Sequence, residues 1–200
     1  MNKVRLYFYP KLDYRELRSK NSYVLDLENV LNKNVEVVNK SNNSKGVLDF
    51  FKFLFKVDAY LFNWIEDLPI YRFGKIQVLV FLIFTCLSKM RGVKFVWILH
   101  NKYSHDFGEN RWTNLMFSWM MKYSDLIITH SSAGVAFGKE QYPKHARKIK
   151  YLPHPVKESL LLGSESNANT KKRYNYDFLF WGTILPYKGI LKFLKSDIGF

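Results

Sequence analysis

The chain has 200 residues, and its 31 lysines and arginines outnumber its 17 aspartates and glutamates, which leaves a formal net charge of +14 at pH 7. Hydrophobic residues make up 48% and aromatic residues 18% of the sequence, a composition that excludes a disordered chain and supplies the apolar surface of a folded core. The positive charge is spread over both halves of the chain, so it belongs to a folded surface and not to a basic tail.

Strand and helix patterns follow one another from the first residues onward. Segment 4–9 is rich in β-branched and aromatic residues and ends at Pro10, which predicts a first strand. Apolar residues at helical spacing over 21–31 predict a helix after it. The same signals predict further strands at 35–38, 59–64, 94–99, 125–129 and 148–152, and further helices at 46–56, 74–90, 110–123 and just after 132.

This alternation predicts the fold class. Continuously apolar strands such as 125–129 are typical of strands that are buried on both faces. Strands of that kind separated by helices predict an α/β fold with a doubly wound parallel, Rossmann-like sheet. In such a sheet ligands bind beyond the carboxyl ends of the strands, which indicates where functional residues belong.

The character of the sequence changes near residue 155. Residues 156–176 are polar and charged, and we interpret them as a linker. A strand at 177–181 and a helix near Gly189 follow, but one strand and one helix cannot bury a core of their own. We therefore interpret 1–155 as one Rossmann-like domain and 177–200 as the start of a second, truncated Rossmann-like domain.

Cys86 is the single cysteine, which excludes a disulfide framework and a thiolate zinc site. It lies in the apolar run 76–87, where we expect a small buried side chain. As a helix this run is about 18 Å long, against roughly 30 Å for a bilayer core, so we expect it not to span the membrane. The first ten residues lack the form of a signal peptide, which favours a reducing cytoplasmic location.

Four of the five histidines fall at or just past predicted carboxyl ends of strands, namely His100, His105, His130 and His154. This placement predicts a site at that edge of the sheet. Each histidine also has a structural interpretation: His100 as a neutral ring that caps a strand, His154 as a turn residue between two prolines, and His105-Asp106 as a helix-entry pair. The histidines do not have the spacing of a metal site, so no metal is expected.

Two segments have the chemistry of anion binding. Ser131 and Ser132 precede a predicted helix. They are either ordinary helix caps or part of a turn whose free backbone N–H groups bind an anion. Gly182 ends a predicted strand and Lys188 begins a helix, which suits a diphosphate; the alternative is a turn with a solvated lysine. Neither a glycine-rich dinucleotide fingerprint nor a P-loop occurs in the sequence.

Six motifs in this order resemble a known family. They are Asn21-Ser-Tyr23, Asn63-Trp64, Val96-Trp-Ile-Leu-His-Asn101 with His105-Asp106, Asp125-Leu-Ile-Ile-Thr-His-Ser131, Ile149-Lys-Tyr-Leu-Pro-His-Pro155 and Phe178-Leu-Phe-Trp-Gly-Thr-Ile-Leu-Pro-Tyr-Lys-Gly189. Together they resemble the GT-B glycosyltransferases of the family 4-like group, which includes bacterial exopolysaccharide and capsule enzymes.

The resemblance implies a hexosyltransferase of cell-surface polysaccharide synthesis. Such an enzyme moves a sugar from a nucleotide-diphosphate sugar to a glycan or lipid-linked acceptor, with retention of configuration and without a cofactor. Residues 1–155 become the acceptor-side domain and 177–200 the start of the donor-binding domain. The implied catalytic residues are His100 and Lys188. The implied donor-binding residues are Gly182, Thr183, Lys188, His130 and Ser131, and the implied acceptor-side residues are Asn21, Asn63, Trp64, Asn101, His105, Asp106 and His154.

The resemblance also bears on completeness and location. The glutamate-rich motif with which the family grips its donor lies further along the chain than residue 200. A missing C-terminal domain or a partner chain is therefore expected to supply it, and the short chain alone is expected to be weak or inactive. A lipid-linked acceptor implies a peripheral position on the anionic inner face of the cell membrane.

A second hypothesis is a non-catalytic basic module that binds an anionic membrane surface or a partner chain. Basic residues of the segment 139–157, namely Lys144, Arg147, Lys148 and Lys150, are candidate contacts. Phe51, Phe53 and Phe55 alternate with lysines and suit a membrane interface, or belong to a core helix. Nucleic acid is not expected, because no nucleic-acid-binding signature occurs.

Overall fold

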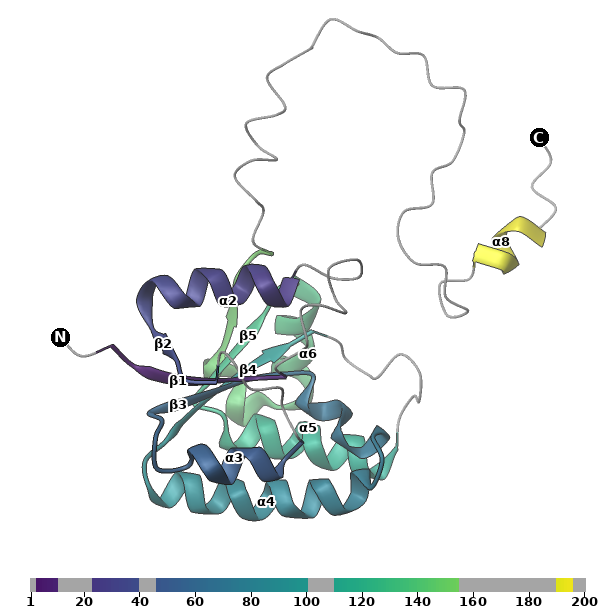
Figure 1. Cartoon of the computed structure of the whole chain (residues 1–200). Coiled ribbons are helices and arrows are strands. Elements are labelled where there is room, and N and C mark those ends of the chain that lie inside the picture. The colour runs from purple at the N-terminus through teal and green to yellow at the C-terminus, as the bar shows by residue number, and fades with distance from the viewer. Residues whose placement is uncertain (1–2, 11–22, 40–45, 101–109, 155–189, 196–200) are drawn as a thin grey trace, which may run out of the picture. The chain divides into compact units, whose positions relative to one another are not determined.

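The computed structural model describes residues 3–10, 23–39, 46–100, 110–154 and 190–195 (Figure 1). The chain divides into two units, Met1–His154 and Pro155–Phe200. In the second unit the described residues form a short helix, α8 (Ile190–Lys195), close to the helix predicted near Gly189. The predicted linker 156–176 and strand 177–181 lie outside the described residues, so the domain boundaries stay predictions.

The first unit contains the parallel sheet that the sequence predicts. The described strands are β1 (Arg5–Tyr9), β2 (Glu36–Val37), β3 (Ala59–Asn63), β4 (Lys94–Leu99), β5 (Leu126–Thr129) and β6 (Ile149–Tyr151). They form a six-stranded sheet of order β2-β1-β3-β4-β5-β6 in which every neighbouring pair is parallel. The order changes direction between β1 and β3, so the carboxyl edge there is a topological switch point.

Helices cover both faces of this sheet. They are α2 (Tyr23–Asn34), α3 (Leu48–Phe53), α4 (Gly74–Met90), α5 (Arg111–Tyr123) and α6 (Ser132–Gln141), with 3-10 helices η1 (Ile65–Ile70) and η2 (Pro143–Lys148). Figure 1 shows α2 on one side of the sheet and α3, α4 and α5 on the other. The α/β class and the doubly wound, Rossmann-like sheet are therefore confirmed.

Two core layers form because successive strand residues point to opposite faces. Tyr60 and Phe62 pack into the layer with α3 and α4, whereas Leu61 packs into the layer with α2. The larger layer is mainly aromatic, and its fully buried rings are Tyr7, Phe50, Tyr60, Phe62, Phe81, Phe84, Phe95 and Trp97. Burying one such side chain contributes about 1.5–3 kcal/mol, so this cluster holds α3 and α4 against the sheet.

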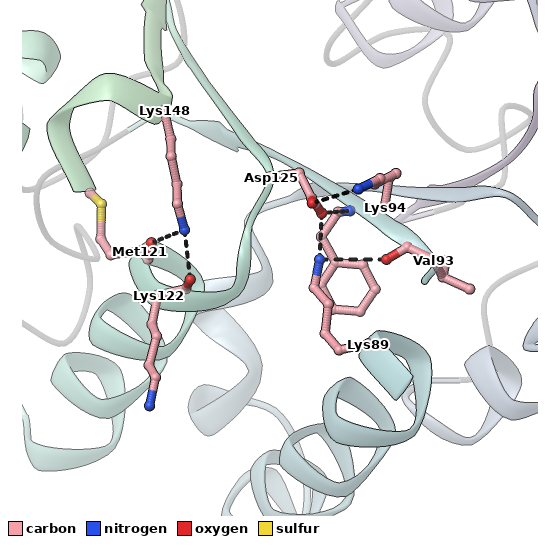
Figure 2. Close-up of polar contacts among 8 residues, drawn as sticks. Lys89, Val93, Lys94, Met121, Lys122, Asp125 and Lys148 are labelled. Carbon is pink, nitrogen blue, oxygen red and sulfur yellow. Dashed lines mark hydrogen bonds and ion pairs between the residues drawn. The ribbon is translucent and has the colours of Figure 1, made fainter. Parts of the chain in front are cut away.

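The amino edge of the sheet is held by polar contacts around Asp125, which precedes β5. Figure 2 shows its carboxylate between Lys89 and Lys94. It accepts hydrogen bonds from Lys89 Nζ, from Lys94 Nζ at 3.3 Å and from the backbone N–H of Phe95 at 2.8 Å. Partial burial acts to raise the pKa of Asp125, but these hydrogen bonds outweigh it and hold the pKa below its usual value.

Lys148 caps a helix at the same edge. Its ammonium group donates hydrogen bonds to the carbonyl oxygens of Lys122 at 2.7 Å and Met121 at 3.4 Å, at the end of α5 (Figure 2). These carbonyls have no partner within the helix, and a cation is favoured at a helix C-terminus. Among the four basic residues predicted to contact an anionic surface, Lys148 therefore has a structural role in α5.

The exposure of Cys86 differs from the expectation. Cys86 is exposed, not buried, because α4 packs its opposite face, including Val78, Phe81 and Thr85, into the core. The two interpretations of the phenylalanines divide between them: Phe55 is 73% exposed, while its neighbours at 51 and 53 pack against the core.

Two short helices were not predicted from the sequence. η1 contains Pro69, and η2 begins with Pro143. Proline interrupts the apolar periodicity that identifies a helix, and 3-10 helices are too short to show such a period. η1 matters for the site because its N-cap residue is Trp64, which follows the carboxyl end of β3.

Candidate functional site

The carboxyl ends of neighbouring strands bring the predicted site residues to one edge of the sheet. Asn63 is the last residue of β3, His100 follows β4, and His130 follows β5. Leu99 and Thr129 are register partners, so the next residues, His100 and His130, leave the sheet at the same level. Their ring centroids are 5.6 Å apart, and those of His130 and His154 are 4.2 Å apart.

Tyr23, the first residue of α2, stands at the centre of this group. Its ring makes edge contacts with the rings of His100, His130 and His154, at centroid distances of 5.2, 5.7 and 5.3 Å. Its hydroxyl group lies 2.8 Å from His130 Nε2. Burial raises the pKa of Tyr23 to about 12, so the phenol keeps its proton at neutral pH and can donate it in a hydrogen bond.

The partners of His130 assign its proton. Nδ1 lies 2.8 Å from the carbonyl oxygen of Leu152, which can only accept, so Nδ1 carries the hydrogen. In the neutral ring Nε2 is then an acceptor, and it receives the hydrogen bond that the Tyr23 hydroxyl donates. The chain Tyr23–His130–Leu152 thus joins the start of α2 to the segment after β6.

His100 is held by a buried amide and an indole. Asn63 donates Nδ2–H to the carbonyl oxygen of Tyr9 at 3.3 Å, which leaves Oδ1 to accept from His100 Nε2 at 3.2 Å. The indole of Trp64 stacks on the imidazole, with the ring centroids 4.7 Å apart and the planes inclined by 16°. His100 Nε2 therefore carries the hydrogen, and Nδ1 keeps its lone pair.

The buried position of His100 and the neighbouring histidines keep its ring uncharged. Burial, and then the nearby rings of His130 and His154, lower its pKa to about 4. At neutral pH the ring is therefore neutral, and its Nδ1 acts as a hydrogen-bond acceptor rather than as a cation or a strong general base. Burial and His130 also lower the pKa of the exposed His154.

Trp64 has an unusual backbone conformation. Its φ of 49° and ψ of 30° lie in the left-handed region, which is uncommon for a bulky side chain. Such strain persists only where the surrounding structure imposes it, and it occurs often at functional sites. Here the strained residue lies between β3 and η1, and its indole stacks on the imidazole of His100.

Ser131 has the structural role that the sequence left open. It is the N-cap of α6, and its hydroxyl accepts a hydrogen bond from the Gly134 backbone N–H at 3.0 Å. The side chain is exposed. The anion-binding interpretation of Ser131 stays a prediction beside this capping role.

The other predicted site residues lie outside the described residues. These are Asn21, Asn101, His105, Asp106, Gly182, Thr183 and Lys188. The donor-diphosphate contacts of Gly182 and Lys188 therefore remain predictions. Among the residues that the structure describes, no three histidine, cysteine or carboxylate side chains are grouped so that they could hold a metal ion.

The sequence gives Tyr23 no role of its own at the site. It lies among the apolar residues at helical spacing over 21–31 and in the motif Asn21-Ser-Tyr23, and the first of these patterns indicates a core position. One available signal was its place at the start of the helix after β1, since that helix begins at the carboxyl edge of the sheet. The structure brings Tyr23 and the three histidines together.

Comparison with known proteins identifies no family for this chain. The chain matches no protein-family model and no curated protein. In the described part of the chain, no helix has both the length and the apolar character needed to cross a membrane.

Proposed function

We propose that this chain is the acceptor-side portion of a glycosyltransferase of the GT-B type, which transfers a hexose from a nucleotide-diphosphate sugar to a glycan or lipid-linked acceptor. The observation that carries the proposal is the group of Tyr23, His100, His130 and His154 at the carboxyl edge of a parallel sheet. That edge is where doubly wound α/β proteins bind their ligands. The motif order in the sequence supports the choice of a sugar-transferring enzyme.

The chemistry of the group suits a sugar. A pyranose offers hydroxyl groups that need paired donors and acceptors and a C–H face that packs on aromatic rings. His100 Nδ1 supplies an uncharged acceptor, and Trp64 and Tyr23 supply apolar ring surface. A neutral imidazole accepts a hydrogen bond from a sugar hydroxyl without adding a second cation to the site.

In this proposal His100 orients the sugar and does not act as the base. With a pKa of about 4 it is a weak base at neutral pH. In a retaining front-face transfer the leaving diphosphate accepts the proton of the attacking hydroxyl, and the protein neutralises the charge that develops on that diphosphate. Lys188 is the predicted residue for this second task.

Histidine ring NMR tests the proposal directly. The five histidines give five ring signals, which single His→Ala variants assign. We expect a nucleotide-diphosphate hexose or a short glycan to shift the signals of His100, His130 and His154. His145 lies in η2, which leads into the amino end of β6, and serves as the internal control. A panel of such ligands that moves none of the three signals, or moves His145 equally, would refute the proposed site.

A transfer assay tests the reaction. Incorporation of labelled sugar into membrane lipids or glycans is measured for the wild type, His100→Ala and His145→Ala, with the C-terminal domain or partner chain supplied where the gene encodes one. We expect His100→Ala to lower the transfer rate about 100-fold or more. Removal of a positioned polar group at a reacting centre typically has an effect of this size. His145→Ala keeps its rate. Equal rates for the two variants would remove His100 from the mechanism.

A further inference from the structure

The outer face of α4 is an apolar stripe that no other described element covers. Its side chains recur at helical spacing and point away from the buried face of Val78, Phe81 and Thr85. The exposed fractions are 61% for Ile76, 52% for Leu79, 59% for Ile83, 39% for Leu87 and 83% for Met90. A helix that is hydrophobic all round is normally buried on all sides, whereas α4 is covered on one side only.

The stripe is long and carries no charge along its centre. From Ile76 to Met90 it extends about 21 Å along the helix axis. The helix has no acidic residue, and its two charged residues, Lys75 and Lys89, lie off the stripe. The ammonium group of Lys89 is bound to Asp125. Soluble monomeric proteins rarely expose a contiguous apolar surface of this kind without a function for it.

An arginine on an exposed phenylalanine marks each end of the stripe. At the start of α4 the guanidinium of Arg72 lies 5.0 Å from the centre of the Phe73 ring. At its end Arg91 lies 4.2 Å from the centre of the Phe55 ring and donates one hydrogen bond to the carbonyl oxygen of Leu54, which leaves further N–H donors on its guanidinium group. The two rings are 64% and 73% exposed. An arginine can lay its apolar stem along an apolar surface and keep its charge in water, and phenylalanine is among the side chains that interfacial helices place on their apolar face.

A recess continues the stripe toward α3. It has a volume of about 440 Å³ and lies between the starts of α3 and α4. Val47, Leu48, Phe73, Ile76 and Val80 line it with apolar surface, and Arg72 stands beside them. Ile76 belongs to both the stripe and the recess, so the two form one apolar surface with a cation at its rim.

We propose that this surface, the α4 stripe with Phe55, Phe73 and the recess, docks on an anionic lipid bilayer. The helix would lie in the plane of the interface, with the aliphatic stripe among the upper acyl chains and Arg72, Lys75 and Arg91 against lipid phosphates. The cations, without a neighbouring acid on α4, match a negatively charged surface. A second copy of the chain fits less well, since facing stripes would bring the same cations together on proteins of net charge +14.

This surface differs from the basic segment 139–157 predicted from the sequence. In that segment Lys148 is tied to the end of α5, and the exposed Lys144 and Arg147 lie in η2, without an apolar stripe. Docking through α4 does not depend on sugar transfer, and it serves the catalytic and the non-catalytic hypothesis alike. Its test therefore uses no nucleotide sugar.

Vesicle flotation with the full chain is the experiment. The vesicles contain phosphatidylcholine alone or phosphatidylcholine with phosphatidylglycerol. The double variant Leu79→Glu with Ile83→Glu places two carboxylates on the stripe, and we expect it to lower the partition coefficient on the anionic vesicles at least about tenfold. The control is Val30→Glu, which adds one carboxylate at a residue of α2 that is 50% exposed, and it should bind nearly like the wild type.

A second pair of variants tests the charged rim. Arg72→Gln with Arg91→Gln should lower partitioning at low salt about 30-fold, since each of the two basic residues near an anionic surface contributes on the order of 1 kcal/mol. Lys144→Gln with Arg147→Gln should leave partitioning nearly unchanged. Circular dichroism spectra that match the wild type establish that every variant is folded.

Three results would overturn the proposal. In the first, the wild type does not float with anionic vesicles. In the second, the stripe variants partition as the wild type does, while the variant at Lys144 and Arg147 no longer binds the vesicles. The basic segment 139–157 would then be the membrane contact. In the third, light scattering shows a dimer that the stripe variants dissociate, without vesicle binding, and the stripe is then a protein interface.

Discussion

The hydroxyl group of Tyr23 lies 2.8 Å from Nε2 of His130, and this contact ties the first turn of α2 to the end of β5. The two residues are 107 positions apart in the sequence. His130 in turn bonds the Leu152 carbonyl with its other nitrogen. A single imidazole therefore aligns three segments at the carboxyl edge of the sheet, and the proposed sugar site depends on that alignment.

Removal of the Tyr23 hydroxyl tests this alignment. Tyr23→Phe keeps the ring contacts but leaves His130 Nε2 without its donor, which should cost about 1 kcal/mol of unfolding free energy. Urea unfolding at neutral pH measures the change. Tyr151→Phe, at an exposed position of β6, is the control and should leave stability unchanged. An equal loss in both variants would show that the Tyr23–His130 bond adds nothing to stability.

The stability of the fold should depend on His100 in mild acid. Its folded-state pKa of about 4 lies below the ordinary value of 6.5, so the unfolded chain binds the proton more readily. The stabilisation is complete above about pH 6.5 and is lost as the pH falls toward 4, by up to about 3 kcal/mol. Urea unfolding across this range measures it. His100→Asn should flatten the profile, whereas an unchanged slope in that variant would assign the pH dependence to other groups.

Glu66 should have the opposite effect near neutral pH. Its carboxyl group is buried beside Trp97, whose Nε1 donates a hydrogen bond to Oε2 at 3.0 Å. Burial raises its pKa to about 8, so the folded protein holds a proton that the unfolded chain releases above about pH 4.5. Stability should then fall as the pH rises from 4.5 to 8.

Two substitutions at Glu66 separate charge from hydrogen bonding. Glu66→Gln keeps an acceptor for Trp97 and removes the ionisable group, so this variant should be the more stable protein at pH 8 by about 1–3 kcal/mol. Glu66→Ala leaves the buried indole N–H unpaired and should be destabilised at every pH. Thermal unfolding at pH 5 and pH 8 compares them. A glutamine variant with the wild-type pH slope would contradict the buried neutral carboxyl.

Asp125 should contribute modestly at the amino edge. Asp125→Asn removes the charge that pairs with Lys89 and Lys94, and the partly exposed site limits the expected loss to about 1 kcal/mol at low salt. Because the pKa of Asp125 is below its usual value, this contribution is present above about pH 4 and disappears as the pH falls through the folded-state pKa. Urea unfolding with and without added salt measures it. A loss that salt does not reduce would show that the hydrogen bond to Phe95 matters more than the charges.

The sequence alone predicted the alternation of strands and helices in the first unit. The limits predicted for the helix 74–90 and the strand 94–99 agree with α4 and β4. The helix is a long apolar run that begins at Gly74, and Gly92 marks the turn between the helix and the strand. The predicted helix 46–56 shortens to α3, which starts and ends within that range. Local pattern does not resolve such ends, since the last turns depend on what they pack against.

The candidate site was predictable in part. The rule that ligands bind beyond strand ends selected His100, His130 and His154, and their proximity in the structure agrees with it. The place of Tyr23 at the start of the helix after β1 was a signal for the same edge, but its contact with His130 was not predictable, because the partner lies 107 positions away in the sequence. The donor side, with Gly182 and Lys188, lies outside the described residues and stays a prediction.

The alternation of strands and helices, the parallel sheet and the edge that carries the histidines follow from the sequence by itself, because they depend on local periodicity and on a general rule of chain topology. The tertiary structure decided which face of α4 is buried, and hence that Cys86 and the stripe from Ile76 to Met90 face outward. It also decided that His100 is neutral. Exposure and pKa depend on neighbours that are distant in the sequence, and a one-dimensional pattern does not contain them.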